Sequence, residues 1–206
     1  MPQLLRVDAQ ENRERILTAA RALFSERGLD LGMREIARHA QVGPATLYRR
    51  FPTKQALIDE AFAAELLTCR TIVEHGCAAT DAWHGFTSVI ERLTALNVQN
   101  RGFVDAFMSA DPAAAAFSAH RRELLGMLDQ LAKRARQQGR LRSDFVINDL
   151  VLVLHAGRGL ASVVPSAREA AARRFARLAI DGFSRSASAA DALELKRDVA
   201  PPVIAP

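Results

Sequence analysis

The apolar residues of this chain recur at intervals of three and four along most of its length, which is the spacing of one face of an α-helix. Residues 11–27 show the pattern first, with one apolar stripe from Ile16 to Phe24, and Gly28 follows as a helix-ending residue. Only 6% of the residues are aromatic although 49% are hydrophobic, a balance that favours packed helices over a sheet. We therefore expect an all-α protein, and 206 residues are enough to bury a core without disulfides or metal.

Two short helices joined by a tight turn are predicted between residues 32 and 51. Apolar residues from Met33 to Ala40 repeat the helical spacing, and Gly32 stands at the capping position with Glu35 three residues further on, as in a weakened capping box. Pro44 suits the first position of a new helix, because its missing N–H has no partner to lose there. That helix must end before Pro52, since the residue preceding a proline disfavours the helical conformation.

The second of these helices, residues 44–50, has the properties of a DNA-reading helix. Leu47 and Phe51 are expected to face inward, and a helix this short can lie in the major groove when another helix supports it. Small residues at its start allow close approach, and hydroxyl and cationic side chains can meet bases and phosphates. The side chains that are free to face outward toward DNA are Pro44, Ala45, Thr46, Tyr48, Arg49 and Arg50.

Lys54 is a further candidate for contact with DNA. Thr53 can cap the helix that follows, and the N-terminal end of that helix, with Lys54 on it, would then point at a phosphate. Two alternatives remain open at this stage. Tyr48 could be a core tyrosine with a solvated hydroxyl, and Arg49–Arg50 could be an ordinary solvated pair.

Charge is concentrated in the same part of the chain. Residues 1–54 contain ten Lys or Arg against six Asp or Glu, a net charge of +4 out of the +5 of the whole sequence. A compact basic segment attached to a nearly neutral body is typical of a nucleic-acid reader that has a separate second function.

The segments RILTAARALFSERG and MREIARHAQVGPATLYRRFPTKQAL, taken together, resemble the DNA-binding domain of the TetR family of transcription factors. The recurring elements of that domain are IL-xAA-xxLF, xEIA-xxAGV, TLYxxF and a lysine before a leucine, and the match covers about residues 11–60. The resemblance implies a three-helix reader, with 44–50 as recognition helix and Lys54 as phosphate-binding lysine. It also implies that Arg34, the second residue of the supporting helix, reaches DNA.

Two departures from the family pattern affect this interpretation. Leu31-Gly32 replaces the usual hydroxyl pair, and Gly43-Pro44-Ala45 replaces the commoner Ser-Lys-Gly. Both remove partners for phosphates or bases, so Arg34 and Arg49 are expected to carry more of the specificity.

The rest of the chain is predicted to be helical, with short breaks after about Gly76 and Gly139. Between them a short segment, GFVDAFMSA, stops at Asp111-Pro112, a pair typical of the start of the next helix. Residues 149–164 are apolar almost all round; their LVLVL run could be a buried strand, but a helix is preferred because no partner strand is evident. The resemblance implies a homodimer formed through the last two helices, about residues 147–164 and 166–186. We expect a DNA-binding domain at 1–54, an effector-binding and dimerisation domain at 55–187 and a disordered tail at 188–206.

The resemblance also implies a pocket in this body for a small-molecule effector. Aromatic and polar residues on the middle helices could line it, although aromatics at helical spacing are more often part of a core. The candidates are Trp83, Phe86, Phe103, Phe107, His120, His155 and Arg158.

Other classes of function find little support in the sequence. It shows no metal-ligand spacing of His, Cys and Asp, no glycine-rich phosphate loop and no nucleophile paired with a base, so we expect neither an enzyme nor a cofactor or metal. No apolar run approaches the roughly 18 residues of a membrane span, and the N-terminus lacks the apolar region of a secretory signal. Cys69 and Cys77 are eight residues apart on one expected helix and cannot bridge, which favours reduced core thiols in a cytoplasmic protein over redox sensors.

The sequence thus predicts a DNA-binding transcriptional regulator, a repressor that a small-molecule effector releases from a palindromic operator. The alternative is a helical small-molecule-binding protein whose basic head is a non-specific docking surface. A small helical hydrolase is a third possibility, which the lack of paired catalytic groups disfavours.

Overall fold

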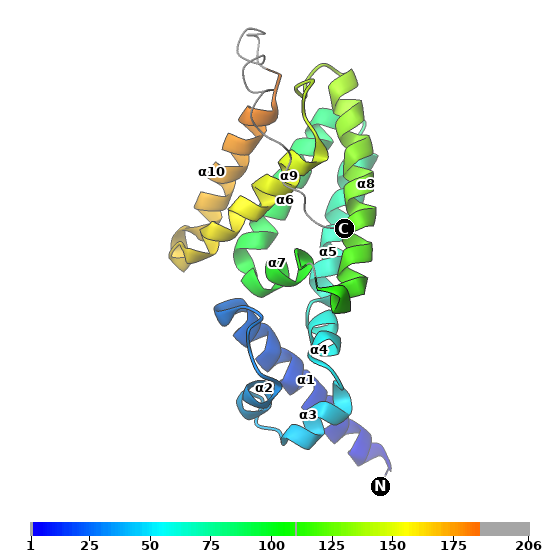
Figure 1. The fold of residues 1–206 in the computed structure, drawn as a ribbon, viewed down its shortest axis with the longest axis vertical. Coiled ribbons are helices and arrows are strands. Elements are labelled where there is room, and N and C mark those ends of the chain that lie inside the picture. The colour runs from blue at the N-terminus through cyan, green and yellow to red at the C-terminus, as the bar shows by residue number, and fades with distance from the viewer. Residues whose placement is uncertain (1, 110, 186–206) are drawn as a thin grey trace. The chain divides into compact units, whose positions relative to one another are not determined.

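A computed structural model describes residues 2–109 and 111–185, and within these ranges the regular elements are helices (Figure 1). Backbone pairing of the β type is confined, in the described part, to one isolated bridge between Leu141 and Ser184. The all-α fold class is therefore confirmed. The helices are α1 (Pro2–Arg27), α2 (Met33–His39), α3 (Pro44–Arg50), α4 (Lys54–Ala61), α5 (Ala63–Ala78), α6 (Ala82–Gln99), α7 (Arg101–Phe107), the 3-10 turn η1 (Pro112–Ala114), α8 (Ala115–Gln137), α9 (Ile147–Ala156), the 3-10 segment η2 (Gly157–Ser162) and α10 (Pro165–Phe183).

The chain forms two compact units, and neither is continuous in sequence. The first unit combines the chain up to Thr68 with residues 100–120, and the second combines residues 69–99 with the chain from Arg121 onward. The domain boundary expected after residue 54 thus falls inside the first unit. The physical reason is that α4 and α7 both pack against α1. The tail expected at residues 188–206 lies outside the described residues.

The core of the first unit is built on the apolar stripe of α1. Ile16 and Phe24 are fully buried, and the Phe24 ring lies 5.9 Å from Phe62, which lies 5.9 Å from Phe103 on α7. Gly102 permits this packing, because a Cβ at its position would lie 2.5 Å from the Phe24 carbonyl oxygen. The backbones of α1 and α7 therefore touch without intervening side chains.

The helix expected to run from residue 54 to about 75 is interrupted. It divides at Phe62 into α4 and α5, and the Ala61 carbonyl at the end of α4 accepts a hydrogen bond of 2.8 Å from Arg21 Nε of α1. A side chain from another helix thus satisfies a carbonyl at the break.

In the second unit, helices α5 and α6 approach each other at two glycines. A Cβ on Gly85 would lie 2.2 Å from the Gly76 carbonyl oxygen, and one on Gly76 would lie 2.3 Å from Val89. Directly after Gly85 on α6, Phe86 belongs to an aromatic cluster in which Phe86 and Phe183 pack against Phe145, with ring centroids 5.5 and 5.1 Å away.

The long apolar helix expected at 149–164 is shorter than predicted. The α-helix α9 stops at Ala156 and continues as η2, where Gly157 and Gly159 lower the helical preference. The final helix begins at Pro165, one residue before the expected start. No helix in the described ranges is both long and apolar enough to cross a bilayer.

Candidate nucleic-acid interface

The turn between α2 and α3 closes with a defined set of backbone hydrogen bonds. Gln41 N–H donates to Arg38 O (3.1 Å) and Val42 N–H donates to Ala37 O (3.0 Å), the pair of bonds of a Schellman helix end. This motif places Gln41 in the left-handed region, at φ 55°. Gln41 stands where the AGV element of the family pattern has glycine.

The helix that follows begins as the sequence predicts. Gly43 is its N-cap and Pro44 its first residue, and Phe51 ends it just before Pro52. On its inner side Leu47 is fully buried and Phe51 is 2% exposed. These two side chains hold α3 against the rest of the first unit.

The outer side of α3 is open to solvent. Tyr48 is 46% exposed, so the alternative of a core tyrosine is wrong, and Arg49 and Arg50 are exposed. Pro44 and Ala45 at the start of the helix are exposed as well, and Thr46 is half-buried. Apart from the side anchored by Leu47, α3 thus offers hydroxyl, cationic and small side chains.

Arg34 and Lys54 come from the neighbouring helices of the same unit. Arg34 is exposed at the second position of α2, and Lys54 is half-buried at the first position of α4. The hydroxyl of Thr53 accepts a hydrogen bond from Ala56 N–H (3.0 Å), which is the expected cap. The predicted DNA contacts therefore lie on three consecutive helices of one unit.

The capping box expected at the start of α2 does not form. Gly32 is the N-cap, but no side chain caps this end, and the Glu35 carboxylate instead pairs with Arg27 of α1. An arginine on another helix outcompetes the local backbone N–H for this carboxylate, since it offers a charge-assisted hydrogen bond.

Four of the arginines counted in the basic segment serve the fold. Arg13 pairs with Glu60, Arg27 pairs with Glu35, Arg21 binds the Ala61 carbonyl, and Arg15 binds two carbonyls at the end of α2. By contrast, among the described residues none forms an ion pair or hydrogen bond with the side chains of Arg34, Arg49, Arg50 or Lys54. The net charge of the segment therefore overstates the number of cations available to a ligand, and Arg34, Arg49, Arg50 and Lys54 are available.

The seven candidates for an effector pocket are divided between the two units. Phe103, Phe107 and His120 belong to the first, and the remaining four, Trp83, Phe86, His155 and Arg158, belong to the second.

Several of these side chains are packed against other rings. Phe86 is fully buried beside Phe145 and Phe183, and Trp83 stacks on Phe86 at 6.2 Å with Arg140 over its indole ring. Phe103 is 1% exposed.

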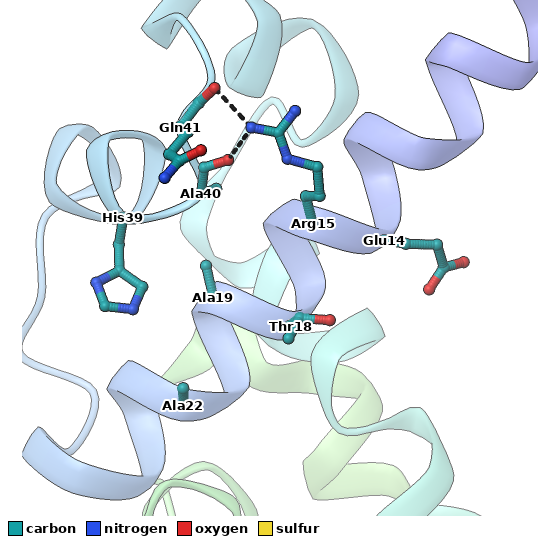
Figure 2. Close-up of a pocket in the computed structure, with 8 residues that line it drawn as sticks. All are labelled: Glu14, Arg15, Thr18, Ala19, Ala22, His39, Ala40 and Gln41. Carbon is teal, nitrogen blue, oxygen red and sulfur yellow. Dashed lines mark hydrogen bonds between the residues drawn. The ribbon is translucent and has the colours of Figure 1, made fainter.

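The first unit has two surface grooves, and none of the seven candidate residues lines either of them. One, of about 400 Å³, runs between α1 and α2 and is drawn in Figure 2; it is lined by Glu14, Arg15, Thr18, Ala19, Ala22, His39, Ala40 and Gln41. The other, of about 490 Å³, lies beside the start of α4 and includes Asp30, Lys54 and Asp111. Within the described ranges, no three His, Cys, Asp or Glu side chains are grouped so as to hold a metal ion.

The fold and the exposed face of α3 together define a class: helical DNA-binding proteins with an N-terminal helix-turn-helix. Residues 16–61 match the family model described as bacterial regulatory proteins, tetR family, and residues 79–185 match the model of the SbtR-like transcriptional regulator C-terminal domain. The chain belongs to the TetR family of transcriptional regulators.

Individual relatives agree with this assignment. The chain is 32% identical to the TetR regulator SCO0520 from Streptomyces coelicolor, with 85% of this chain and 99% of that one covered and a TM-score of 0.52. SCO3833, from Streptomyces coelicolor A3, shares the fold at a TM-score of 0.65 and 20% identity, over 82% and 91% of the two chains. The regulator UidR from Escherichia coli strain K12 is 44% identical over 55 residues, which is 26% of this chain and only 28% of UidR.

Proposed function

We propose that this protein is a repressor that binds a palindromic operator through α3 and is released by a small-molecule effector. The observation that carries the proposal is the two-sided character of α3. Leu47 and Phe51 anchor its inner side, while Tyr48, Arg49 and Arg50 are exposed on its outer side. A helix so anchored can enter the major groove without disturbing the core of its own unit.

Different side chains have different roles in this proposal. Arg49 reads a base edge, with Arg34 as the second candidate, because a guanidinium can donate two hydrogen bonds to guanine. Thr46, Tyr48, Arg50 and Lys54 bind phosphates and fix the register, and Pro44 and Ala45 let the backbone approach the bases.

We propose a homodimer formed through α9, η2 and α10. Large apolar side chains are exposed on these elements, with Leu152 at 42% and Leu178 at 55%, and Val146 and Val164 just before α9 and α10 at 52% and 63%. Burying such side chains against a second copy removes apolar surface from water. The dimer would hold two recognition helices about 34–36 Å apart, matching half-sites one turn of DNA apart.

The proposed effector is a small apolar molecule bound in the body of the protein. The first unit offers Phe107 and His120, whose rings lie 6.3 Å apart, edge to face. An effector that favours the released form by about 1–3 kcal/mol per site would be sufficient to shift the equilibrium. A panel of small apolar molecules tested for a rise in Tm, and then for release of the operator, would identify it; Phe107→Ala should weaken both responses.

Selection of bound sequences from a random DNA library tests the function directly. We expect enrichment of a short palindrome, and then protection of that palindrome in a footprint at physiological salt. The competing hypothesis, a small-molecule-binding protein with a basic docking surface, predicts weak binding without sequence preference. Recovery of unenriched DNA after several rounds would reject the repressor proposal.

A further inference from the structure

The guanidinium of Arg15 binds the end of α2 from the neighbouring helix α1. Its Nη2 donates to the carbonyl oxygens of Ala40 (2.8 Å) and Gln41 (2.9 Å), as Figure 2 shows. These two carbonyls lie at the C-terminal end of α2, where a helix leaves its last carbonyls without partners inside the helix. A cation there is also favoured by the helix dipole.

The backbone that Arg15 binds is unfavourable without support. Gln41 has φ 55°, a conformation in which a side chain other than glycine crowds the following carbonyl. Arg15 contributes hydrogen bonds that are possible only while the turn keeps this shape, and it therefore stabilises the left-handed residue.

The turn determines the direction of α3. Gly43 follows Gln41 by two residues and caps α3: its carbonyl accepts the first hydrogen bonds of the helix, from Thr46 N–H (3.0 Å) and Leu47 N–H (3.1 Å). A helix of this length spans about 10 Å, so a rotation of roughly 10° at the turn moves its far end by about 2 Å. A displacement of that size breaks a hydrogen bond to a base edge.

Three other arginines of α1, namely Arg13, Arg21 and Arg27, bind partners away from this turn. Arg13 and Arg27 pair with the carboxylates of Glu60 and Glu35, and Arg21 binds the carbonyl of Ala61 at the end of α4. Among them, Arg21 is the closest chemical match to Arg15, since it too donates to a carbonyl at a helix end.

We propose that Arg15 is a positioning residue for operator recognition: it fixes the Ala40–Gly43 turn and thereby the direction in which α3 presents its side chains to bases. The inference rests on the proposed function, in which α3 reads the operator. Arg15 acts through the turn, and contact with DNA is no part of its role.

The test compares Arg15→Ala and Arg15→Gln with the matched control Arg21→Ala. Each variant and the unaltered dimer would be titrated with the operator, with single-base operator variants and with non-operator DNA, over a range of salt. We expect both Arg15 variants to lose about tenfold in operator affinity, the size of a lost hydrogen bond to a charged group. Affinity for non-operator DNA should fall by much less than operator affinity, because every side chain that binds a phosphate is still present and binding without sequence preference needs no fixed direction of α3.

Amide hydrogen exchange provides a structural readout. Exchange at residues 40–43 should accelerate in the Arg15 variants and remain unchanged in Arg21→Ala, which should also keep its discrimination between sequences. If Arg21→Ala loses discrimination as the Arg15 variants do, the effect is general destabilisation and the positioning role is refuted.

Gln41→Gly offers a rescue that a merely structural role would not show. Glycine adopts the left-handed conformation without strain, so Gln41→Gly should restore part of the lost discrimination in the Arg15→Ala background and leave discrimination in the unaltered protein as it was. An equal gain in stability in both backgrounds, with no recovery of discrimination, would contradict the proposal.

The outcomes separate this inference from the function on which it rests. If the unaltered dimer shows no sequence preference, the proposed function fails, and the role of Arg15 fails with it. If the unaltered dimer prefers its operator and Arg15→Ala keeps that preference and the slow exchange of the turn, only the positioning role is overturned.

Discussion

Arg49 and Lys54 are both cations of the first unit to which the described residues offer no partner, yet their removal should have different effects. Arg49→Ala should cost on the order of 1–3 kcal/mol on the preferred operator and relax the choice of base at one position of each half-site. Lys54→Ala should weaken binding to all sequences alike and reduce the salt slope by about one ion for each phosphate that the lysine neutralises. Fluorescence anisotropy across operator variants and salt concentrations measures both, and equal losses on every sequence for both variants would refute this division of roles.

The thiol of Cys77 is expected to react slowly with electrophiles and oxidants. Burial raises its pKa, an effect that the nearby Arg134 cation partly opposes, so the thiolate fraction at neutral pH is smaller than in a free cysteine. Its sulfur also lies 3.6 Å from the Met127 carbonyl oxygen. The rate at which iodoacetamide alkylates Cys77 in the folded protein at pH 7.5, followed by mass spectrometry, should be lower than the rate for an unfolded peptide that contains this cysteine. A faster reaction would restore redox sensing as a hypothesis.

At the residue scale, local signals were predictable from sequence and distant partners were not. The cap at Thr53, Pro44 at the first helical position and the inward side chains of α3 all follow from a few neighbouring residues. The partners of Arg15 and Arg21 lie 25 to 40 residues away, and nothing in the local pattern reveals them. The left-handed Gln41 did leave a signal, because the family pattern has glycine at that position.

At the scale of elements, the α5–α6 crossing depends on glycine. A Cβ at Gly85 would lie 2.2 Å from the backbone carbonyl of Gly76, so Gly85→Ala should force the helices apart and destabilise the protein by about 1–3 kcal/mol. Gly126 on α8 is the matched control, since a Cβ there would meet nothing within 4 Å and alanine should stabilise the helix by up to about 1 kcal/mol. Urea unfolding curves of the two variants would measure the difference, and a Gly85→Ala protein as stable as the original would show that the crossing adapts.

Helix ends were predicted well where a special residue marks them and poorly where packing sets them. Gly28 and Gly139, both with positive φ, end α1 and α8 as expected, and Asp111 caps the turn before α8. The interruption at Phe62 has no such marker, and the carbonyl before it is bound by Arg21, a residue of α1 far away in sequence. The apolar run at 149–164 suggested one long helix, since a segment that is apolar almost all round does not show where an α-helix tightens into a 3-10 segment.

At the scale of the whole molecule, dimerisation is the first property to test. Leu178→Glu should shift the protein from dimer toward monomer, because it places a charge on an exposed apolar position of α10, in the middle of the proposed interface. Leu67→Glu on α5 is the matched control, an exposed leucine outside that interface, and should remain dimeric. Light scattering coupled to size-exclusion chromatography distinguishes the two, and a dimeric Leu178→Glu protein would place the interface elsewhere.

The composition of the two units could not be foreseen from the order of residues along the chain. The sequence marks GFVDAFMSA only as a short segment, and nothing in it reveals that helix α7, which forms there, packs against α1. Contacts between segments so far apart depend on shape complementarity, as at Gly102 and Phe24, which a periodic pattern does not encode.

The fragment 2–68 should therefore be less stable, and unfold less cooperatively, than the full chain. Without α7 it would expose the surface of Phe62 that Phe103 contacts and the part of Phe24 that Gly102 contacts in the full chain. Circular dichroism should show a melting transition that is broad and lower in temperature than that of the full protein. A sharp transition at the same temperature would indicate that α7 adds little.

The contact of Gly102 with α1 has a practical consequence for anyone who wishes to exchange parts between relatives. A transferred segment that ends at residue 61, where the match to the tetR family model ends, would contain the recognition helix α3. It would lack α7, the helix whose Gly102 contacts α1. A chimeric regulator that takes its DNA-binding part from this chain should therefore include residues 100–120 as well as residues 1–68, and take the segment between them from the other parent.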